Sequence, residues 1–178
     1  MDKLEPSDYR FCPRCGRGLE PRVLKSEEDP RPTCSACGFV VFFDPKLAAC
    51  TAFMIDGGIV LLKRAVSPAK GKWVFPGGFV NRGEPVHLAA IRETREEVNL
   101  RVGLTGILDV YSFPGEATAV VVYAAHVLSG NLEARDETLE VRAFEPELLP
   151  WDELGFASTR SALHDYLRRF FPRVRGVP

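Results

Sequence analysis

Four of the five cysteines form two closely spaced pairs that could bind one metal ion. Two residues separate Cys12 from Cys15 and Cys34 from Cys37, and eighteen residues lie between the pairs. Thiolates at this spacing are typical ligands of a structural zinc site, in which four sulfurs surround the ion tetrahedrally. Two redox dithiols or two disulfides are the alternatives, but an odd number of cysteines argues against disulfides. We therefore predict a structural Zn²⁺ site with these four ligands.

Three glutamates crowd one face of a helix that the apolar spacing predicts over residues 85–98. Glu93, Glu96 and Glu97 are three and four residues apart, so their side chains are neighbours on the helix surface. Two carboxylates about 5.5 Å apart repel each other by about 3 kcal/mol at an effective dielectric constant of about 20. Bound Mg²⁺ or Mn²⁺, which prefer oxygen ligands, would relieve this repulsion. The alternative is an exposed acidic face that Arg92 and Arg95 balance.

The residues from Gly78 to the end of this helix resemble the Nudix box, whose pattern is G-x5-E-x7-R-E-U-x-E-E-x-G-U. Five residues separate Gly78 from Glu84, seven separate Glu84 from Arg92, and the three glutamates follow in register. Asn99 replaces the final glycine, but asparagine also tolerates the left-handed conformation needed at a helix C-terminus. Thr94 stands where an aliphatic residue is more usual, which we interpret as a packing change away from the carboxylates.

This resemblance implies a hydrolase that uses Mg²⁺ or Mn²⁺ to cleave the diphosphate bond of a nucleoside diphosphate linked to another group. It also implies residue roles. The metal ligands would be the carboxylates of Glu93, Glu96 and Glu97 and the backbone carbonyl of Gly77. Arg92 would orient a glutamate by a charge-assisted hydrogen bond, and Glu84 would help to tie the loop to the helix.

One further glutamate from outside the box is expected to act as general base. The segment at residues 136–140 resembles the part of the family that supplies this residue. By that resemblance we favour Glu137 as the base and additional metal ligand, with Glu140 second. An ordinary acidic loop is the alternative interpretation.

The two cysteine pairs followed by the box resemble the zinc-ribbon Nudix group, which contains NADH pyrophosphatases and relatives that act on FAD or ADP-ribose. Residues 108–115 do not match the S-Q-P-W-P-F-P segment of NADH pyrophosphatases, whereas residues 137–144 and 154–158 look closer to the FAD/ADP-ribose branch. We therefore expect FAD or ADP-ribose as substrate. The alternatives are an NADH pyrophosphatase, or a non-catalytic nucleotide sensor or zinc-ribbon binding module. The presence of every box glutamate argues against a sensor.

The elements that must position these residues are predicted to form an α/β fold. The resemblance implies a Nudix α/β/α sandwich with a mixed sheet over residues 46–172, preceded by a small N-terminal zinc ribbon over residues 10–45. Hydrophobic patterns and turn residues predict a hairpin turn at Asp56-Gly57-Gly58 and a final helix after a series of strands. The expected strands and helices cover residues 47–55, 59–62, 85–98, 101–112, 117–128, 141–144 and 158–170.

Composition narrows the class of partner. The chain has 178 residues, with 23 Lys and Arg against 24 Asp and Glu, so its formal net charge is −1. Residues 1–45 hold seven basic against eight acidic residues, which argues against a nucleic-acid partner and favours a nucleotide-sized substrate. No apolar run is long enough for a membrane span, and the first residues lack a signal-peptide pattern. We expect a cytoplasmic protein, and a homodimer is left open.

Overall fold

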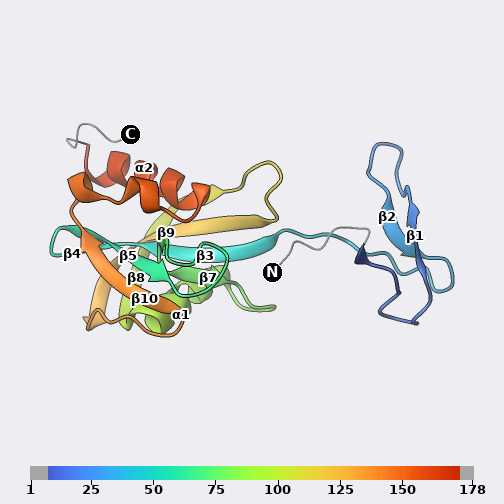
Figure 1. Ribbon diagram of the computed structural model, residues 1–178, viewed down its shortest axis with the longest axis horizontal. Helices are drawn as coiled ribbons and strands as arrows, with labels where there is room; N and C mark the ends of the chain where they lie inside the picture. The colour runs from blue at the N-terminus through green and yellow to red at the C-terminus, as the bar shows by residue number, and fades with distance from the viewer. Residues whose placement is uncertain (1–7, 173–178) are drawn as a thin grey trace. The chain divides into compact units, whose positions relative to one another are not determined.

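The computed structural model describes residues 8–172. The chain divides into two compact units between Pro45 and Lys46. The N-terminal unit is drawn in blue in Figure 1, and each unit is described by itself. Neither α-helix in the described part of the chain has the length and apolar character that a bilayer-spanning helix needs.

The N-terminal unit is an antiparallel β-ribbon with one tight turn at each cysteine pair. Strand β1 (Leu19–Arg22) pairs with β2 (Arg31–Cys34) along its whole length. Gly16 and Gly38 follow the two cysteine pairs with φ values of 73° and 72°, a conformation that glycine adopts at little cost. Each glycine donates its backbone N–H to the carbonyl of the first cysteine in its pair, at 2.8 and 3.0 Å. The two turns therefore present both cysteine pairs in the same way.

The C-terminal unit contains two four-stranded sheets. One has the order β7-β3-β9-β8, and the other has the order β10-β5-β4 with β6 also paired to β5. Strands β3 and β9 are parallel and all other neighbours are antiparallel, so the first sheet is mixed. The strands are β3 (Lys46–Ala52), β4 (Met54–Ile55), β5 (Gly58–Arg64), β6 (Trp73–Val74), β7 (Gly77–Phe79), β8 (Leu100–Tyr111), β9 (Thr118–Gly130) and β10 (Thr138–Phe144).

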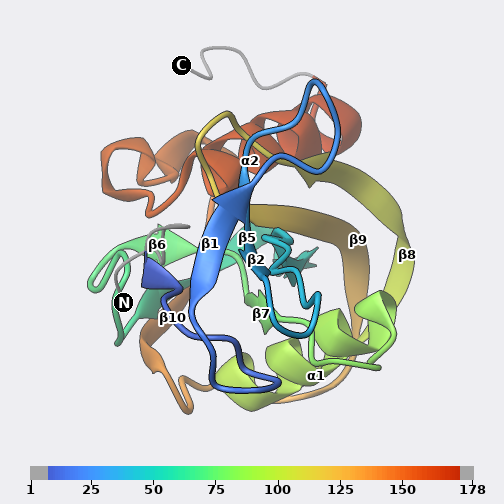
Figure 2. The same cartoon turned by 90° about the vertical axis from the view of Figure 1, so that its right-hand side faces the viewer.

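Two α-helices cover the strands from opposite sides, as Figures 1 and 2 both show. They are α1 (Val86–Val98) and α2 (Ala157–Phe170), and two 3₁₀ turns, η2 (Pro146–Leu148) and η3 (Trp151–Glu153), precede α2. The side chains of α2 pack into one core cluster, which includes Trp73. The end of α1 contributes Val98 to a second cluster around Phe53. These layers confirm the predicted α/β/α architecture with a mixed sheet and a cysteine-bearing ribbon before it.

Local sequence explains where α1 begins and ends. Pro85 is extended and precedes the first helical residue, a position where the missing N–H of proline costs nothing. Asn99 ends the helix with φ 59° and ψ 28°, and its N–H donates to the carbonyl of Arg95. The prediction that asparagine takes the left-handed C-terminal position is confirmed. Ala89 and Ala90 are fully buried, and their small side chains let α1 lie close to Ala49 of β3.

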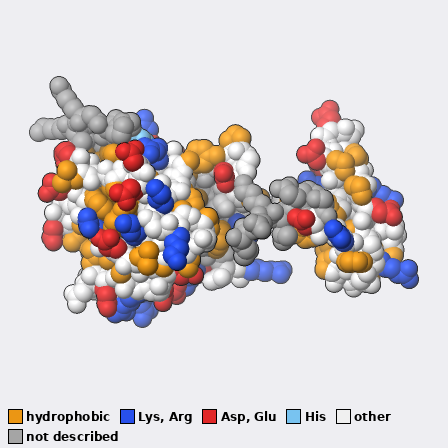
Figure 3. All heavy atoms as spheres, viewed as in Figure 1, with side chains coloured by type: hydrophobic (Ala, Val, Ile, Leu, Met, Phe, Trp, Pro, Cys, Tyr) orange, Lys and Arg blue, Asp and Glu red, His pale blue; other side chains and the backbone are white. Residues whose placement is uncertain are grey.

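Charged side chains of both signs are interspersed on the face of the C-terminal unit that Figure 3 shows. This distribution agrees with a formal net charge close to zero. No large field of one sign develops on that face, so an anionic ligand would be bound by particular cationic side chains rather than by the surface as a whole.

Candidate active site

The turn into β7 brings the backbone of Gly77 against the last turn of α1. The N–H of Gly77 donates to Oε2 of Glu97 at 2.8 Å. Gly77 has a φ of 155°, and a Cβ there would come within 2.5 Å of both the carbonyl oxygen of Ala49 and the sulfur of Cys50. Only glycine fits at this position because both its conformation and its closeness to β3 exclude a side chain.

Gly78 provides the space in which the carboxylate of Glu93 lies. A Cβ on Gly78 would be 2.5 Å from Cδ of Glu93 and 2.6 and 2.7 Å from its two carboxylate oxygens. The missing side chain therefore lets Glu93 pack directly on the backbone of β7. Neighbouring glycines thus serve two different glutamates of α1.

Arg92 joins three carboxylates through one guanidinium group. Its Nε and Nη2 donate to the two carboxylate oxygens of Glu84 at 2.7 and 3.0 Å. Its Nη1 donates to Glu93 at 2.7 Å and to Glu96 at 2.9 Å. The hydrogen bonds from Arg92 lower the pKa of Glu84 to about 2. The forked geometry of arginine suits this bidentate pairing, and it ties the loop before α1 to the helix.

Glu97 differs from the other glutamates because it is buried and outside the reach of Arg92. Its residue is 7% exposed, and Gly77 supplies its one recorded side-chain hydrogen bond among the described residues. Burial raises the pKa of Glu97 to about 8, although the hydrogen bond from Gly77 opposes the shift, and the charges of Glu93 and Glu137 add to it. Burial also raises the pKa of Glu93. The charge of Arg64 offsets only part of the rise in the pKa of Glu97. A buried carboxylate without a salt bridge is costly, so a bound cation would stabilise it.

The donor set around Glu97 fits a hard divalent cation. It consists of carboxylate and carbonyl oxygens, which Mg²⁺ and Mn²⁺ prefer over sulfur or nitrogen ligands. The carboxylates of Glu93, Glu96 and Glu97 are not gathered as tightly as the four cysteines. Within residues 8–172, the four cysteines are the one group of three or more His, Cys, Asp or Glu side chains whose ligand atoms all lie within 4.8 Å of one another.

The two candidates for the additional glutamate differ in their surroundings. Glu137 is exposed in the loop before β10, and its charge contributes to the raised pKa of Glu97. Glu140 lies within β10, where its carboxylate accepts a hydrogen bond from Nη2 of Arg142 at 2.5 Å. The same guanidinium lies 5.7 Å from the ring centre of Trp73. Glu140 is therefore already engaged by Arg142.

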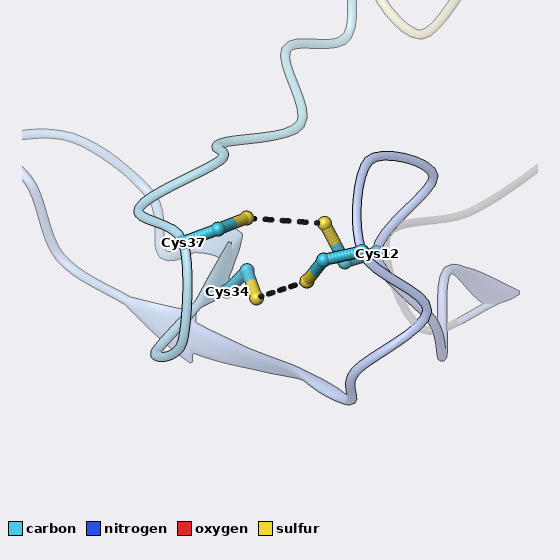
Figure 4. Close-up of side chains that lie close together, drawn as sticks. Cys12, Cys34 and Cys37 are labelled. Carbon is cyan, nitrogen blue, oxygen red and sulfur yellow. Dashed lines mark hydrogen bonds between the residues drawn. The ribbon is translucent and has the colours of Figure 1, made fainter.

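The four cysteines of the ribbon converge, as Figure 4 shows for the three that it labels. The sulfurs of Cys12 and Cys37 are 3.6 Å apart, and those of Cys15 and Cys34 are 3.5 Å apart. A tetrahedral ion with Zn–S bonds of about 2.3 Å requires sulfurs about 3.8 Å apart, so the geometry fits zinc. The backbone N–H of Cys37 helps to lower the pKa of the Cys34 thiol to about 7, whereas burial and the neighbouring thiols raise the pKa of Cys37. A bound Zn²⁺ would stabilise the thiolate form of all four cysteines.

A buried threonine pair under α1 was not predicted as a structural feature. The hydroxyl of Thr94 donates to the carbonyl of Ala90 at 2.7 Å, and the Oγ1 atoms of Thr94 and Thr51 are 2.6 Å apart. Both threonines are fully buried, so this pair fixes the helix on β3 through hydrogen bonds. The signal in the sequence was the departure from an aliphatic residue at position 94. A departure from a pattern shows only that packing differs and does not reveal the partner.

Comparison with known protein families identifies both parts of the chain. The family model described as "NUDIX domain" matches residues 45–173, and the model described as "Nudix N-terminal", a zinc ribbon, matches residues 10–42. A crystal structure of a NUDIX hydrolase from Nitrosomonas europaea is 30% identical, with a TM-score of 0.82, and the match covers 91% of this chain and 93% of that one.

Two curated relatives differ in the activity that their names state. An ADP-ribose pyrophosphatase of Methanocaldococcus jannaschii is 33% identical over 132 residues, which are 72% of this chain and 76% of that protein. A NAD-capped RNA hydrolase NudC of Pseudomonas aeruginosa is 27% identical over 143 residues, which are 79% of this chain and 49% of that protein. This chain therefore spans about half the length of that relative.

Proposed function

The chain belongs to the Nudix family, and on that premise we propose that it hydrolyses the diphosphate bond of a nucleoside-diphosphate-linked substrate with Mg²⁺ or Mn²⁺ as cofactor. One observation carries the proposal. The guanidinium of Arg92 holds Glu84, Glu93 and Glu96 beside the backbone of β7, while Glu97 lies buried against Gly77 and forms no salt bridge with the described residues. This arrangement leaves an anionic, oxygen-rich site for a divalent ion and a polyphosphate.

The chain's own residues would hold and orient the reacting groups. We assign the cation to Glu93, Glu96 and Glu97, with the carbonyl of Gly77 as a further ligand. When bound, the cation supplies charge neutralisation at the phosphate oxygens and activates the attacking water. Arg92 fixes the rotamers of Glu93 and Glu96 through its hydrogen bonds, so these carboxylates lose little conformational entropy on binding.

We assign the general base to Glu137. Its side chain is exposed in the loop before β10 and its charge contributes to the raised pKa of Glu97, which supports a place for it beside the metal-binding carboxylates. Glu140, the second candidate from the sequence, is bonded to Arg142 and is less available to take a proton. The test is a pair of variants, Glu137→Gln and Glu140→Gln. The first should lower kcat much more than the second at saturating metal.

ADP-ribose is the substrate that we place first, with FAD next, because the match to the ADP-ribose pyrophosphatase of M. jannaschii covers most of this chain and most of that protein. The NudC relatives give a second candidate, a NAD-capped RNA end, and NADH remains the alternative from the sequence. The sequence-based expectation against a nucleic-acid partner rested on average charge, and it does not exclude a capped end bound at a local site. The cytoplasmic location and the division into residues 10–45 and 46–172 stay predictions.

The first experiment is a turnover panel with Mg²⁺ and with Mn²⁺. The substrates are ADP-ribose, FAD, NADH, NAD⁺, nucleoside triphosphates and a NAD-capped RNA, with phosphatase added to reveal the monophosphates formed. Glu97→Gln should lower kcat by at least about 100-fold, while Glu147→Gln, an exposed glutamate in η2, should retain activity. Full activity in Glu97→Gln would refute the metal assignment. Absence of turnover in the metal-loaded wild type would favour a nucleotide sensor.

A further inference from the structure

A groove of about 650 Å³ runs along the outer face of α1, beside the loop that joins β9 to β10. One carboxylate of the proposed metal site, Glu96, forms part of its wall, so the groove opens directly at that site. Its lining consists of two apolar side chains and five charged ones, which are Leu88, Ile91, Arg92, Arg95, Glu96, Arg135 and Asp136.

The loop wall of the groove is fixed to the end of α1. The N–H of Arg135 donates to the carbonyl of Glu97 at 2.9 Å, and the N–H of Glu133 donates to the carbonyl of Val98 at 3.2 Å. The side-chain amide of Asn99 donates to the carbonyl of Asn131 at 3.1 Å. The first two bonds satisfy carbonyls that a helix end leaves without partners, and all three hold the loop against the end of the helix. The groove is therefore formed before any ligand arrives.

The three arginines of the groove differ in the hydrogen bonds and ion pairs that they already make. Arg92 is fully used by three glutamates, and Arg135 is paired with Glu133 at 2.7 Å. Arg95 is exposed, and its guanidinium makes no recorded hydrogen bond or ion pair with the residues that the structure describes. Its side chain lies one turn from Arg92 on the same face of α1. Arg95 therefore offers a free donor fork close to the proposed diphosphate site.

We propose that this groove binds a second phosphate group of the substrate, one that lies outside the diphosphate to be cleaved. The proposal rests on the proposed function, because the carboxylates of α1 must hold the diphosphate for the groove to receive what is attached to it. Arg95 would bind the extra phosphate with two parallel N–H···O bonds, and Arg135 would contribute charge from the facing wall. The half-exposed side chain of Leu88 and the neighbouring Ile91 give an apolar floor for a sugar or base.

A phosphate in this place could come from two sources. A dinucleotide can carry a phosphate on the 2′-oxygen of its ribose, and a nucleotide chain continues from the 3′-oxygen through a phosphodiester. A plain dinucleotide such as ADP-ribose has neither group. The groove would therefore separate phosphate-extended substrates from plain ones while the same carboxylates perform the cleavage.

The test measures the binding of three product-like ligands by calorimetry in the presence of Mg²⁺. They are AMP, adenosine 2′,5′-bisphosphate and adenosine 3′,5′-bisphosphate. We expect one bisphosphate to bind the wild type about tenfold more tightly than AMP, and Arg95→Ala to remove that difference. Arg95→Lys should keep part of it as a point charge. The matched control is Arg101→Ala, an exposed arginine of β8 outside the groove lining. A 2′ preference would indicate the dinucleotide source and a 3′ preference the nucleotide chain.

The proposal is overturned if both bisphosphates bind the wild type no better than AMP, if none of the three ligands binds, or if Arg95→Ala retains the preference. Turnover of ADP-ribose in Arg95→Ala should remain within about threefold of the wild type, because ADP-ribose lacks the extra phosphate. Loss of the phosphate preference with retained turnover supports the groove. Absence of turnover in the wild type itself instead contradicts the proposed function, whatever the bisphosphates do.

Discussion

Replacing Gly78 by alanine should reduce catalysis without weakening the fold. The new Cβ would lie 2.5 Å from Cδ of Glu93, and normal contact begins near 3.4 Å, so the carboxylate must move by about 0.9 Å. The atoms in the way belong to the flexible end of a side chain, and the backbone of Gly78 lies outside the conformations that only glycine tolerates. A displacement of about 1 Å in a catalytic group costs on the order of 100-fold in rate.

The assay measures kcat with the substrate that the wild type prefers, and urea unfolding measures stability. We expect kcat of Gly78→Ala to fall about 100-fold, while the free energy of unfolding changes by less than about 1 kcal/mol. Gly77→Ala is the matched comparison, since its Cβ would meet the backbone of Ala49 and Cys50 at 2.5 and 2.6 Å. We expect Gly77→Ala to lose about 3 kcal/mol of stability together with its activity. A Gly78→Ala protein with wild-type kcat would refute the role of Glu93, and one as unstable as Gly77→Ala would refute the steric argument.

Three further predictions concern other parts of the molecule. The folded state lowers the pKa of Glu84 to about 2, so its charge stabilises the protein at pH values above the unfolded pKa of about 4.5. In urea unfolding, the difference in the free energy of unfolding between the wild type and Glu84→Gln should therefore be complete above about pH 5 and disappear as the pH falls through about 2. Cys34→Ser should lose its zinc, as measured by elemental analysis, and its backbone amides in residues 10–42 should exchange faster. A variant that retained stoichiometric zinc would disprove the four-thiolate site. Thr94→Val should cost about 1–2 kcal/mol in chemical denaturation because Thr51 stays buried without its partner, and adding Thr51→Val should recover part of the loss.

The helices and most of the longer strands could be predicted from the sequence because local chemistry determined them. The single strand expected over 47–55 was wrong, because the chain passes from one sheet to the other there as β3 and β4, and the short strands β1, β2, β6 and β7 were not predicted. The turn at Asp56 and Gly57 has φ values of 49° and 83°, which is the two-residue hairpin turn that this dipeptide favours. The helix over 85–98 and the last helix were predicted to within one residue of α1 and α2. The paired cysteines also meet as their spacing required.

Features that depend on contacts between distant segments could not be predicted in the same way. The Thr51–Thr94 pair joins a strand to a helix 43 residues further along the chain. The groove requires the loop after β9 to dock on the end of α1, and neither segment shows this in its own sequence. In the alternative interpretation of an exposed acidic face, Arg92 and Arg95 together balanced the glutamates, whereas in the structure it is Arg92 that donates hydrogen bonds to them.

The acidic face of α1 needs two different cations, and the geometry shows why one cannot replace the other. Arg92 comes from the helix itself, so its fork can reach carboxylates on the outer side and on the preceding loop, namely Glu84, Glu93 and Glu96. Glu97 makes no recorded bond to that fork and lies against the backbone of β7, where the N–H of Gly77 is its recorded donor. The donors of Arg92 are also engaged by these carboxylates, whereas a divalent ion can bind carboxylates and substrate oxygens together. The arginine therefore sets the shape of the site, while burial raises the pKa of Glu97 to about 8, and a bound metal ion would displace its proton and stabilise the carboxylate.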